Sequence, residues 1–144
     1  MSLLLALWLA AQIEVSPASC TLARAERITF EAAVDQGPRL NRRCVALHGI
    51  WAGRALYRNM AQTRLAGAEI VAANARDRVG ISAPDAITRR SPRPDSYLVV
   101  GILYDCSVFE GEEVFGYCHF HRRGPFIAVT YAFRRHWPTL RAYP

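Results

Sequence analysis

Alternating apolar and polar positions predict β-strands in the C-terminal third of the chain. Residues 96–109 are rich in β-branched and aromatic side chains, and residues 114–120 and 126–134 continue this composition after short turns. Gly101 lies within the first segment and predicts a β-bulge or a sharp bend. Strand alternation predicts two faces for the last segment, with Phe126, Ala128, Thr130 and Ala132 on one and Ile127, Val129, Tyr131 and Phe133 on the other.

The N-terminal half predicts one short helix followed by a β-hairpin. Residues 22–35 repeat apolar positions at helical spacing, and Gly37 with Pro38 behind it is a stop signal for that helix. Residues 44–51 alternate as a strand does, and residues 54–58 form the return strand after a tight turn.

The middle of the chain has the weakest periodicity. The alanine-rich residues 61–75 predict a helix, and residues 69–73 fit a strand equally well. Residues 79–82 predict a short strand, and residues 83–95 contain three prolines and predict a loop. Five or six strands with one or two short helices indicate a mostly β domain. A small, partly open barrel suits this pattern, because closing a sheet hides its edges.

The run NRRCVALHGIW, residues 41–51, resembles the first strand of exported bacterial OB-fold-like domains. In that family a short helical segment precedes a G-(K/R)-x-V-x-(V/L)-x-G strand, and a hairpin partner follows it. The match places Val45 and Leu47 inside and Gly49 at a bend, with Asn41 where the family usually has glycine.

Residues 97–104 also resemble the V-x-G-x-(I/L) strand of such barrels, and the resemblance covers about half of the chain. It implies an OB-like barrel of five to six strands with a binding face. It implies no reaction, because one fold serves many functions.

The N-terminus predicts export. Residues 3–11 are nine apolar residues, the length of a signal-peptide core and too few to cross a membrane. We therefore interpret residues 1–19 as a signal peptide or N-terminal export segment, and residues 20–144 as a single domain. The expected location is periplasmic or secreted, and no transmembrane helix is expected in the mature chain.

Four cysteines fit an oxidising compartment and allow three pairings. Cys106 and Cys118 flank a turn-like segment, which favours a disulfide between them and leaves Cys20 to pair with Cys44. Free buried thiols and a metal cluster are the alternatives at this stage.

The positive charge comes from arginine alone. All 18 basic residues are arginine, the net charge is +6, and the two halves of the chain share it equally. Guanidinium groups bind phosphates and carboxylates bidentately, so an anionic ligand or a protein is the expected partner. An even distribution argues against a dedicated nucleic-acid arm.

The stretch Cys118-His119-Phe120-His121 is the densest cluster of reactive side chains. Strand alternation would put Cys118 and His119 on opposite faces, which argues against a shared Zn²⁺ ion, so we expect no metal and no cofactor. The same alternation puts Tyr117, His119 and His121 together on one face.

Two functions follow from these observations. The favoured one is a non-catalytic exported or envelope-associated binding module with an aromatic and basic surface. Its candidate binding residues are Arg54, Arg58, Tyr104, Tyr117, His119 and His121, with Tyr104 the first choice for an exposed aromatic. The alternative is a small secreted hydrolase of ribonuclease type that uses His119 and His121 in acid–base catalysis.

Overall fold

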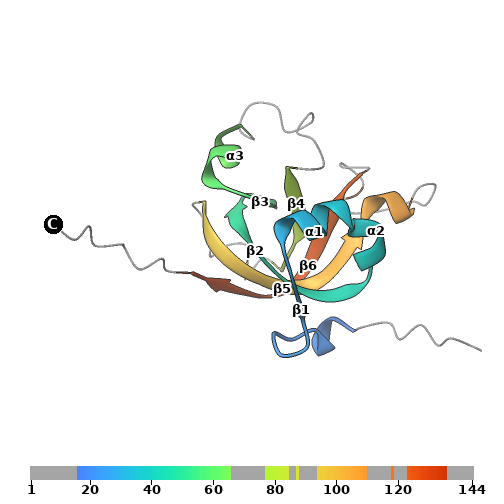
Figure 1. Cartoon of the computed structure of the whole chain (residues 1–144). Helices are drawn as coiled ribbons and strands as arrows, with labels where there is room; N and C mark the ends of the chain where they lie inside the picture. The colour runs from blue at the N-terminus through green and yellow to red at the C-terminus, as the bar shows by residue number, and fades with distance from the viewer. Residues whose placement is uncertain are drawn as a thin grey trace, which may run out of the picture.

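Six strands form a single sheet, and five of them close into a barrel (Figure 1). The computed structural model describes residues 16–65, 77–84, 87, 94–109, 118 and 123–135. The strands are β1 (Glu26–Ile28), β2 (Arg43–Ala52), β3 (Ala55–Tyr57), β4 (Arg78–Ser82), β5 (Asp95–Asp105) and β6 (Pro125–Arg134). The mostly β class predicted from the sequence is confirmed, together with the first hairpin and the short fourth strand.

The strand order shows how the barrel closes. Neighbouring strands follow the order β1-β2-β3-β4-β6-β5, and β5 returns to pair with β2 from Arg43 to Trp51. β6 joins β4 in parallel through three residue pairs, which match Gly80, Ile81 and Ser82 with residues 126–128. The barrel, predicted to be partly open, is therefore a closed ring of strands with one short seam.

Alternate residues of the strands fill the barrel interior, as strand geometry requires. Val45 and Leu47 point inward as predicted, and Trp51 follows them on the same face of β2. The remaining barrel residues of this core are Leu56, Val79, Ile81, Tyr97, Val99, Leu103, Ile127 and Val129.

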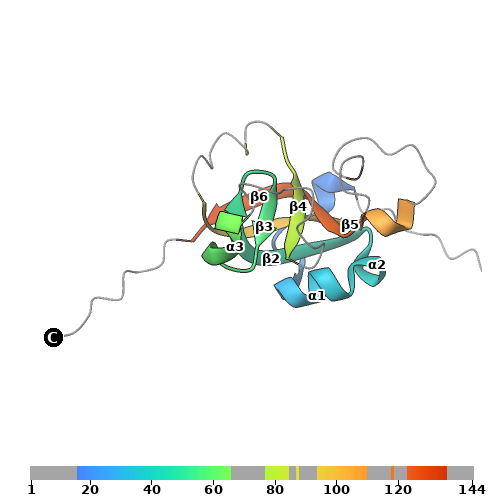
Figure 2. The same ribbon diagram turned by 90° about the horizontal axis from the view of Figure 1, so that it is seen from above.

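Two short helices close one end of the barrel. They are α1 (Phe30–Asp35) and α2 (Gly37–Leu40), and they lie together against the barrel in Figure 2. Thr29 caps α1, because its hydroxyl accepts a hydrogen bond from the Ala32 amide at 3.0 Å. Phe30 and Leu40 join the barrel core from these helices. We call this the closed end.

The helix predicted for residues 22–35 is wrong in its first half. Residues 26–28 are strand β1, which pairs in parallel with residues 45–47 of β2. Three residues are too few for an alternation signal, so backbone pairing overrides the helical spacing. A third α-helix, α3 (Met60–Leu65), follows β3 at the start of the alanine-rich segment where the sequence predicts a helix. With the separate helix α2, the described residues contain three short α-helices, whereas the sequence predicts one or two.

The segment before β1 covers part of the outer barrel wall. It includes the 3-10 turn η1 (Pro17–Ser19) and lies below the barrel in Figure 1. A disulfide joins Cys20 to Cys44 of β2, with 5.4 Å between their Cα atoms. Cys20 is fully buried in a second apolar cluster outside the barrel, where it packs with Ala46, Val100 and Ile102.

A β-bulge interrupts the pairing of β5 with β6, at the glycine where the sequence predicts one. Val100 lies opposite Tyr131 and Gly101 opposite Val129, so Thr130 is the extra residue. A Cβ on Gly101 would lie 2.2 Å from the Ala128 carbonyl oxygen, so only glycine fits this crossing without a shift.

The bulge also corrects the predicted faces of β6. Ile127 and Val129 are buried in the barrel, but Tyr131 and Phe133 are exposed, with exposed fractions of 46% and 45%. The extra residue reverses the alternation, so Ala132 packs against the barrel core instead.

The strand predicted for residues 96–109 ends at Asp105, where the 3-10 turn η2 (Cys106–Phe109) begins. A disulfide joins Cys106 to Cys118, so both pairs favoured by the sequence are present. Cys118 is the one described residue of the strand predicted at 114–120, and its backbone is helical. Within the described ranges, no helix is long and apolar enough to cross a membrane.

Candidate functional site

Neither α1 nor α2 covers the opposite end of the barrel, and we call it the open end. It is built from the end of β2, the start of β5 and the last residues of β6. β4 ends at Ser82, which lies opposite Ala128, whereas β6 continues to Arg134. Beyond Ala128, no described strand pairs with the side of β6 that faces away from β5.

A cavity of about 470 Å³ follows this stretch of β6, and we call it the β6 groove. Its lining residues are Trp51, Ile87, Tyr97, Thr130, Tyr131, Ala132, Phe133 and Arg134. Consecutive side chains of a strand point to opposite faces, so one face alone cannot supply five consecutive residues. The groove therefore runs along the backbone edge of β6 and touches both faces of the strand.

Two aromatic rings form the inner wall of the β6 groove. Trp51 and Tyr97 pack edge to face with 5.4 Å between ring centroids, and their exposed fractions are 1% and 7%. The indole Nε1–H of Trp51 donates a hydrogen bond to the Gly53 carbonyl at 2.8 Å. That bond holds the indole in place and leaves the groove a rigid, apolar inner wall.

The charge at the rim of the groove is mainly positive. Arg134 forms an ion pair with Asp95 across the ends of β6 and β5, and its side chain remains 58% exposed. Arg135 follows immediately, and its backbone N–H bonds to the Ser96 carbonyl at 2.9 Å. Arg54 is exposed in the turn after Trp51. Among the described residues, these three arginines and Asp95 have a net charge of +2.

The outer wall beside the groove carries an apolar row across three strands. His48, Leu98 and Phe133 occupy facing positions on β2, β5 and β6. Tyr131 stacks on Phe133 at 6.5 Å between centroids. We call Tyr131 and Phe133 the outer aromatic pair.

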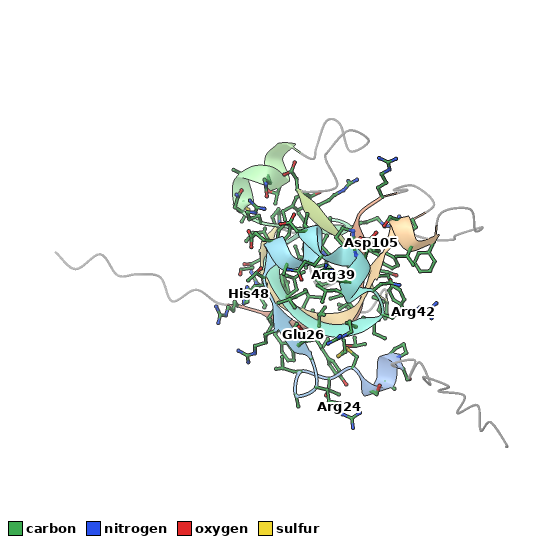
Figure 3. The ribbon with its side chains drawn as sticks, turned by 45° about the vertical axis from the view of Figure 1, so that its right-hand side comes forward. Arg24, Glu26, Arg39, Arg42, His48 and Asp105 are labelled. Atoms are coloured by element: carbon green, nitrogen blue, oxygen red, sulfur yellow. A yellow bond between two sulfur atoms is a disulfide. The ribbon has the colours of Figure 1, made fainter. Side chains whose placement is uncertain are left out.

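His48 is the titratable group of that row, and Figure 3 shows it on the outside of the barrel wall. Burial lowers the pKa of its imidazole below the usual value, and the charge of Arg135 lowers it further. Its Nε2 atom is buried without a hydrogen-bond partner. The neutral imidazole thus packs as an apolar ring between strands.

No family model matches this chain, and no curated protein or solved structure matches it either.

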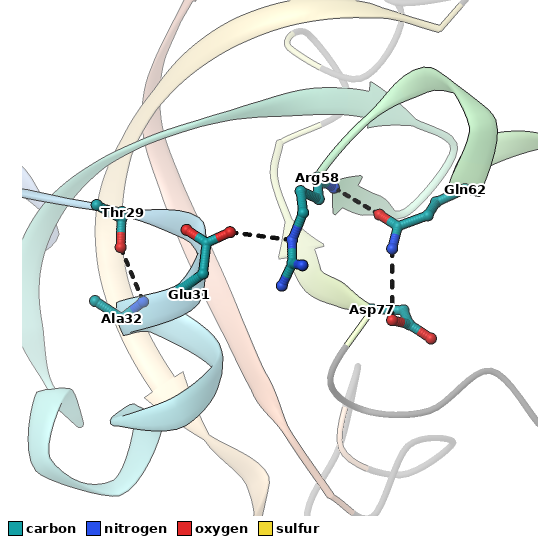
Figure 4. A network of polar contacts seen from close by, with 6 residues as sticks. All are labelled: Thr29, Glu31, Ala32, Arg58, Gln62 and Asp77. Atoms are coloured by element: carbon teal, nitrogen blue, oxygen red, sulfur yellow. Dashed lines mark hydrogen bonds and ion pairs between the residues drawn. The ribbon is translucent and has the colours of Figure 1, made fainter.

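The predicted binding residues do not come together at one site. Arg58 lies at the closed end, where its Nε is 3.0 Å from a Glu31 carboxylate oxygen and its guanidinium lies over the Phe30 ring at 5.7 Å. Figure 4 shows this contact continuing through Gln62, which accepts from the Arg58 amide and bonds to Asp77. Arg58 therefore ties α1 to the chain after β3.

Tyr104 is half-buried rather than freely exposed. Its ring stacks on Phe126 at 5.2 Å and contacts Phe109 at 6.4 Å. These neighbours cover its faces, which leaves little area for stacking a ligand. Of the predicted binding residues, Arg54 alone is described at the open end.

Tyr117, His119 and His121 lie outside the described residues, so the structure neither joins nor separates them. A shared face for these three side chains requires a β-strand, whereas the backbone of Cys118, between Tyr117 and His119, is helical. In the described part of the chain, no three potential metal ligands cluster together. All four cysteines are disulfide-bonded.

Sequence reasoning missed Trp51, Tyr97 and Arg134 as members of one site. Tyr97 follows Trp51 by 46 residues, and Arg134 follows Tyr97 by 37. The three meet because the start of β5 pairs with the end of β2 and with the end of β6. The available signal was Gly101, whose bulge turns Tyr131 and Phe133 outward.

Proposed function

We propose that this protein is a non-catalytic, exported binding module whose open end takes an anionic partner. The observation that carries the proposal is the β6 groove, where an apolar aromatic wall lies beside a rim of net positive charge. Pockets that combine apolar walls with a few directed polar groups are the usual form of ligand sites. The partner contributes negative charge, because the whole chain carries +6.

Export is proposed from the cysteines and the N-terminal sequence. Two disulfides persist in oxidising compartments and are uncommon in the reducing cytosol. Thiol labelling of the denatured, unreduced protein from its own cells should detect no free thiol. Four reactive thiols per chain would contradict both the disulfides and the export.

The binding proposal is tested with three anionic probes: heparin, a ten-nucleotide RNA, and an octapeptide of alternating glutamate and valine. Fluorescence anisotropy at 50 and 200 mM salt should show salt-sensitive binding of at least one probe. The double variant Arg134→Gln, Arg135→Gln should weaken that binding about tenfold. A control with the same loss of charge, Arg24→Gln with Arg27→Gln, lies on the N-terminal segment and β1 and should weaken it less than threefold.

Failure of all three probes to bind would contradict the function. The hydrolase alternative is tested with the same RNA. Cleavage by the wild type that is lost in His119→Ala or His121→Ala would replace the binding function with catalysis.

A further inference from the structure

We infer that the β6 groove binds an extended, acidic segment of another protein by strand addition to the free edge of β6. This inference rests on the proposed function and specifies the class of partner. It draws on three observations: the direction of the backbone groups of β6, the shape of the groove and the charge of its rim.

The β5–β6 pairing fixes which backbone groups of β6 face the groove. The Arg135 N–H bonds to the Ser96 carbonyl of β5, and residues of an antiparallel strand point alternately toward and away from their partner. Phe133 and Tyr131 therefore direct their backbone groups toward β5. Ala132 and Arg134 direct theirs to the opposite edge, along which the groove runs.

Such an edge is a template for another strand. Unpaired N–H and C=O groups along an edge strand bind extended peptides through main-chain hydrogen bonds, while adjacent pockets select their alternate side chains. Among the described residues, none bonds to the Ala132 or Arg134 backbone on this edge. A cavity of about 470 Å³ beside the edge has room for one or two apolar side chains against Trp51 and Tyr97.

The two faces of β6 predict the order of apolar and acidic residues in the partner segment. Side chains of an added strand alternate, so one set would enter the groove beside the inward-facing Ala132, and the other would lie outside with Tyr131 and Phe133. Arg134 lines the groove and pairs with Asp95, Arg135 follows it in sequence, and Arg54 lies in the turn after β2. The matching segment alternates apolar and acidic residues.

An anionic polysaccharide or an RNA strand complements the positive charge of the rim but cannot pair with the backbone edge of β6. Neither polymer carries the regular amide N–H and C=O groups that pair with a β-strand, and neither has an apolar side chain for the inner wall. Charge alone would not distinguish these partners, whereas the backbone edge favours a peptide.

The test uses the alternating glutamate–valine octapeptide in three forms. One is unmodified, one is N-methylated at its four glutamates and one at its four valines, because N-methylation removes a backbone donor. Strand addition uses donors of one set only. One methylated form should therefore bind at least tenfold more weakly than the unmodified peptide, and the other within threefold of it.

A protein variant makes the reciprocal change. Ala132→Pro removes one N–H at the groove edge and leaves the bonds from β6 to β5 in place, as edge strands tolerate. It should weaken peptide binding about tenfold. Leu22→Pro is the proline control, because Leu22 is exposed and is the second residue of the turn that the Arg24 N–H closes on the Thr21 carbonyl, a position that favours proline. It should leave binding unchanged. Circular dichroism and thermal unfolding confirm that each variant is folded.

If Ala132→Pro does not fold, Ala132→Trp, which fills the groove from its inner side, replaces it with the same expected loss. Equal binding of both methylated peptides would overturn strand addition and leave the anionic-binding function standing. Binding of heparin or RNA without binding of the peptide would do the same. Self-association of the free protein that is lost in Ala132→Pro would identify a second copy as the occupant and would also overturn the inference.

Discussion

The two ends of the barrel use similar residues for opposite purposes. At the closed end, Phe30 enters the core and Arg58 lies over its ring while pairing with Glu31. At the open end, Phe133 stands 45% exposed, with Arg134 and Arg135 beside it. The same pair of residue types is structural beside α1 and is exposed at the end of β6.

The contrast shows why a small barrel can tolerate an unpaired edge. Phe30 and Leu40 complete the core at the closed end, and the disulfide to Cys44 holds Cys20 against the outside of β2. β6 pairs with β5 along its length, and no described strand pairs with its far edge after Ala128. Stability and binding are therefore expected to respond to different substitutions.

Replacing one phenylalanine at each end with alanine should give the largest difference in the free energy of unfolding. Phe30→Ala should lower the free energy of unfolding by about 3–4 kcal/mol, because it empties a buried site and removes a cation–π contact. Phe133→Ala should cost less than about 1 kcal/mol and should instead weaken peptide binding. Urea unfolding and anisotropy measure the two quantities. Similar losses of stability for both variants would erase the distinction between the ends.

Removing either disulfide should reduce stability without changing the groove. Cys20 and Cys44 are 24 residues apart, and Cys106 and Cys118 are 12 apart. Chain entropy gives a cost of about 3 kcal/mol for each double serine variant. Urea unfolding without reductant measures the loss, and peptide affinity at 15 °C checks the groove. If the peptide affinity of a folded variant falls more than threefold, the shape of the groove depends on that disulfide.

Replacing Arg58 should lower stability and replacing Arg54 should lower peptide affinity, each by a smaller amount. Arg58→Ala should cost about 1 kcal/mol of stability, because it breaks an exposed ion pair and uncovers Phe30. Arg54→Ala should leave stability unchanged and weaken binding of the acidic peptide two- to threefold. Chemical unfolding and anisotropy on both variants give the comparison. The reverse pattern would support the sequence-based placement of Arg58 in the binding surface.

The smallest effect concerns pH and the outer wall. The folded-state pKa of His48 is lowered, so the neutral form favours folding. Its contribution is complete above the ordinary histidine pKa of about 6.5 and is lost as pH falls through the lower folded value. Thermal unfolding between pH 7.5 and 5 should show a slope that His48→Gln reduces. An unchanged slope would mean that His48 does not titrate differently on folding.

Much of the fold is readable from the sequence because its strands are long or tightly joined. The alternation around Val45 and Leu47, the turn at Gly53 and the bulge at Gly101 are all local signals. β1 escapes detection because three residues pair in parallel with a strand that lies 15 residues farther along the chain.

The open end is harder to predict because it depends on how unequal strands pair. β4 is five residues long and β6 is ten, and their three matched pairs determine where the free edge begins. The outward turn of Tyr131 depends on Thr130 being the extra residue. Its hydroxyl lies 2.9 Å from the Cys20 carbonyl and 3.2 Å from that of Val100, contacts that involve distant segments.

Hydrogen exchange at the free edge of β6 tests the central claim most directly. The backbone amides of Ala132 and Arg134 should exchange rapidly in the free protein and at least tenfold more slowly with the saturating glutamate–valine octapeptide. The amides of Tyr131 and Phe133, already bonded to β5, should be slow in both states. Slow exchange at Ala132 and Arg134 before the peptide is added, or no change after it, would contradict the account.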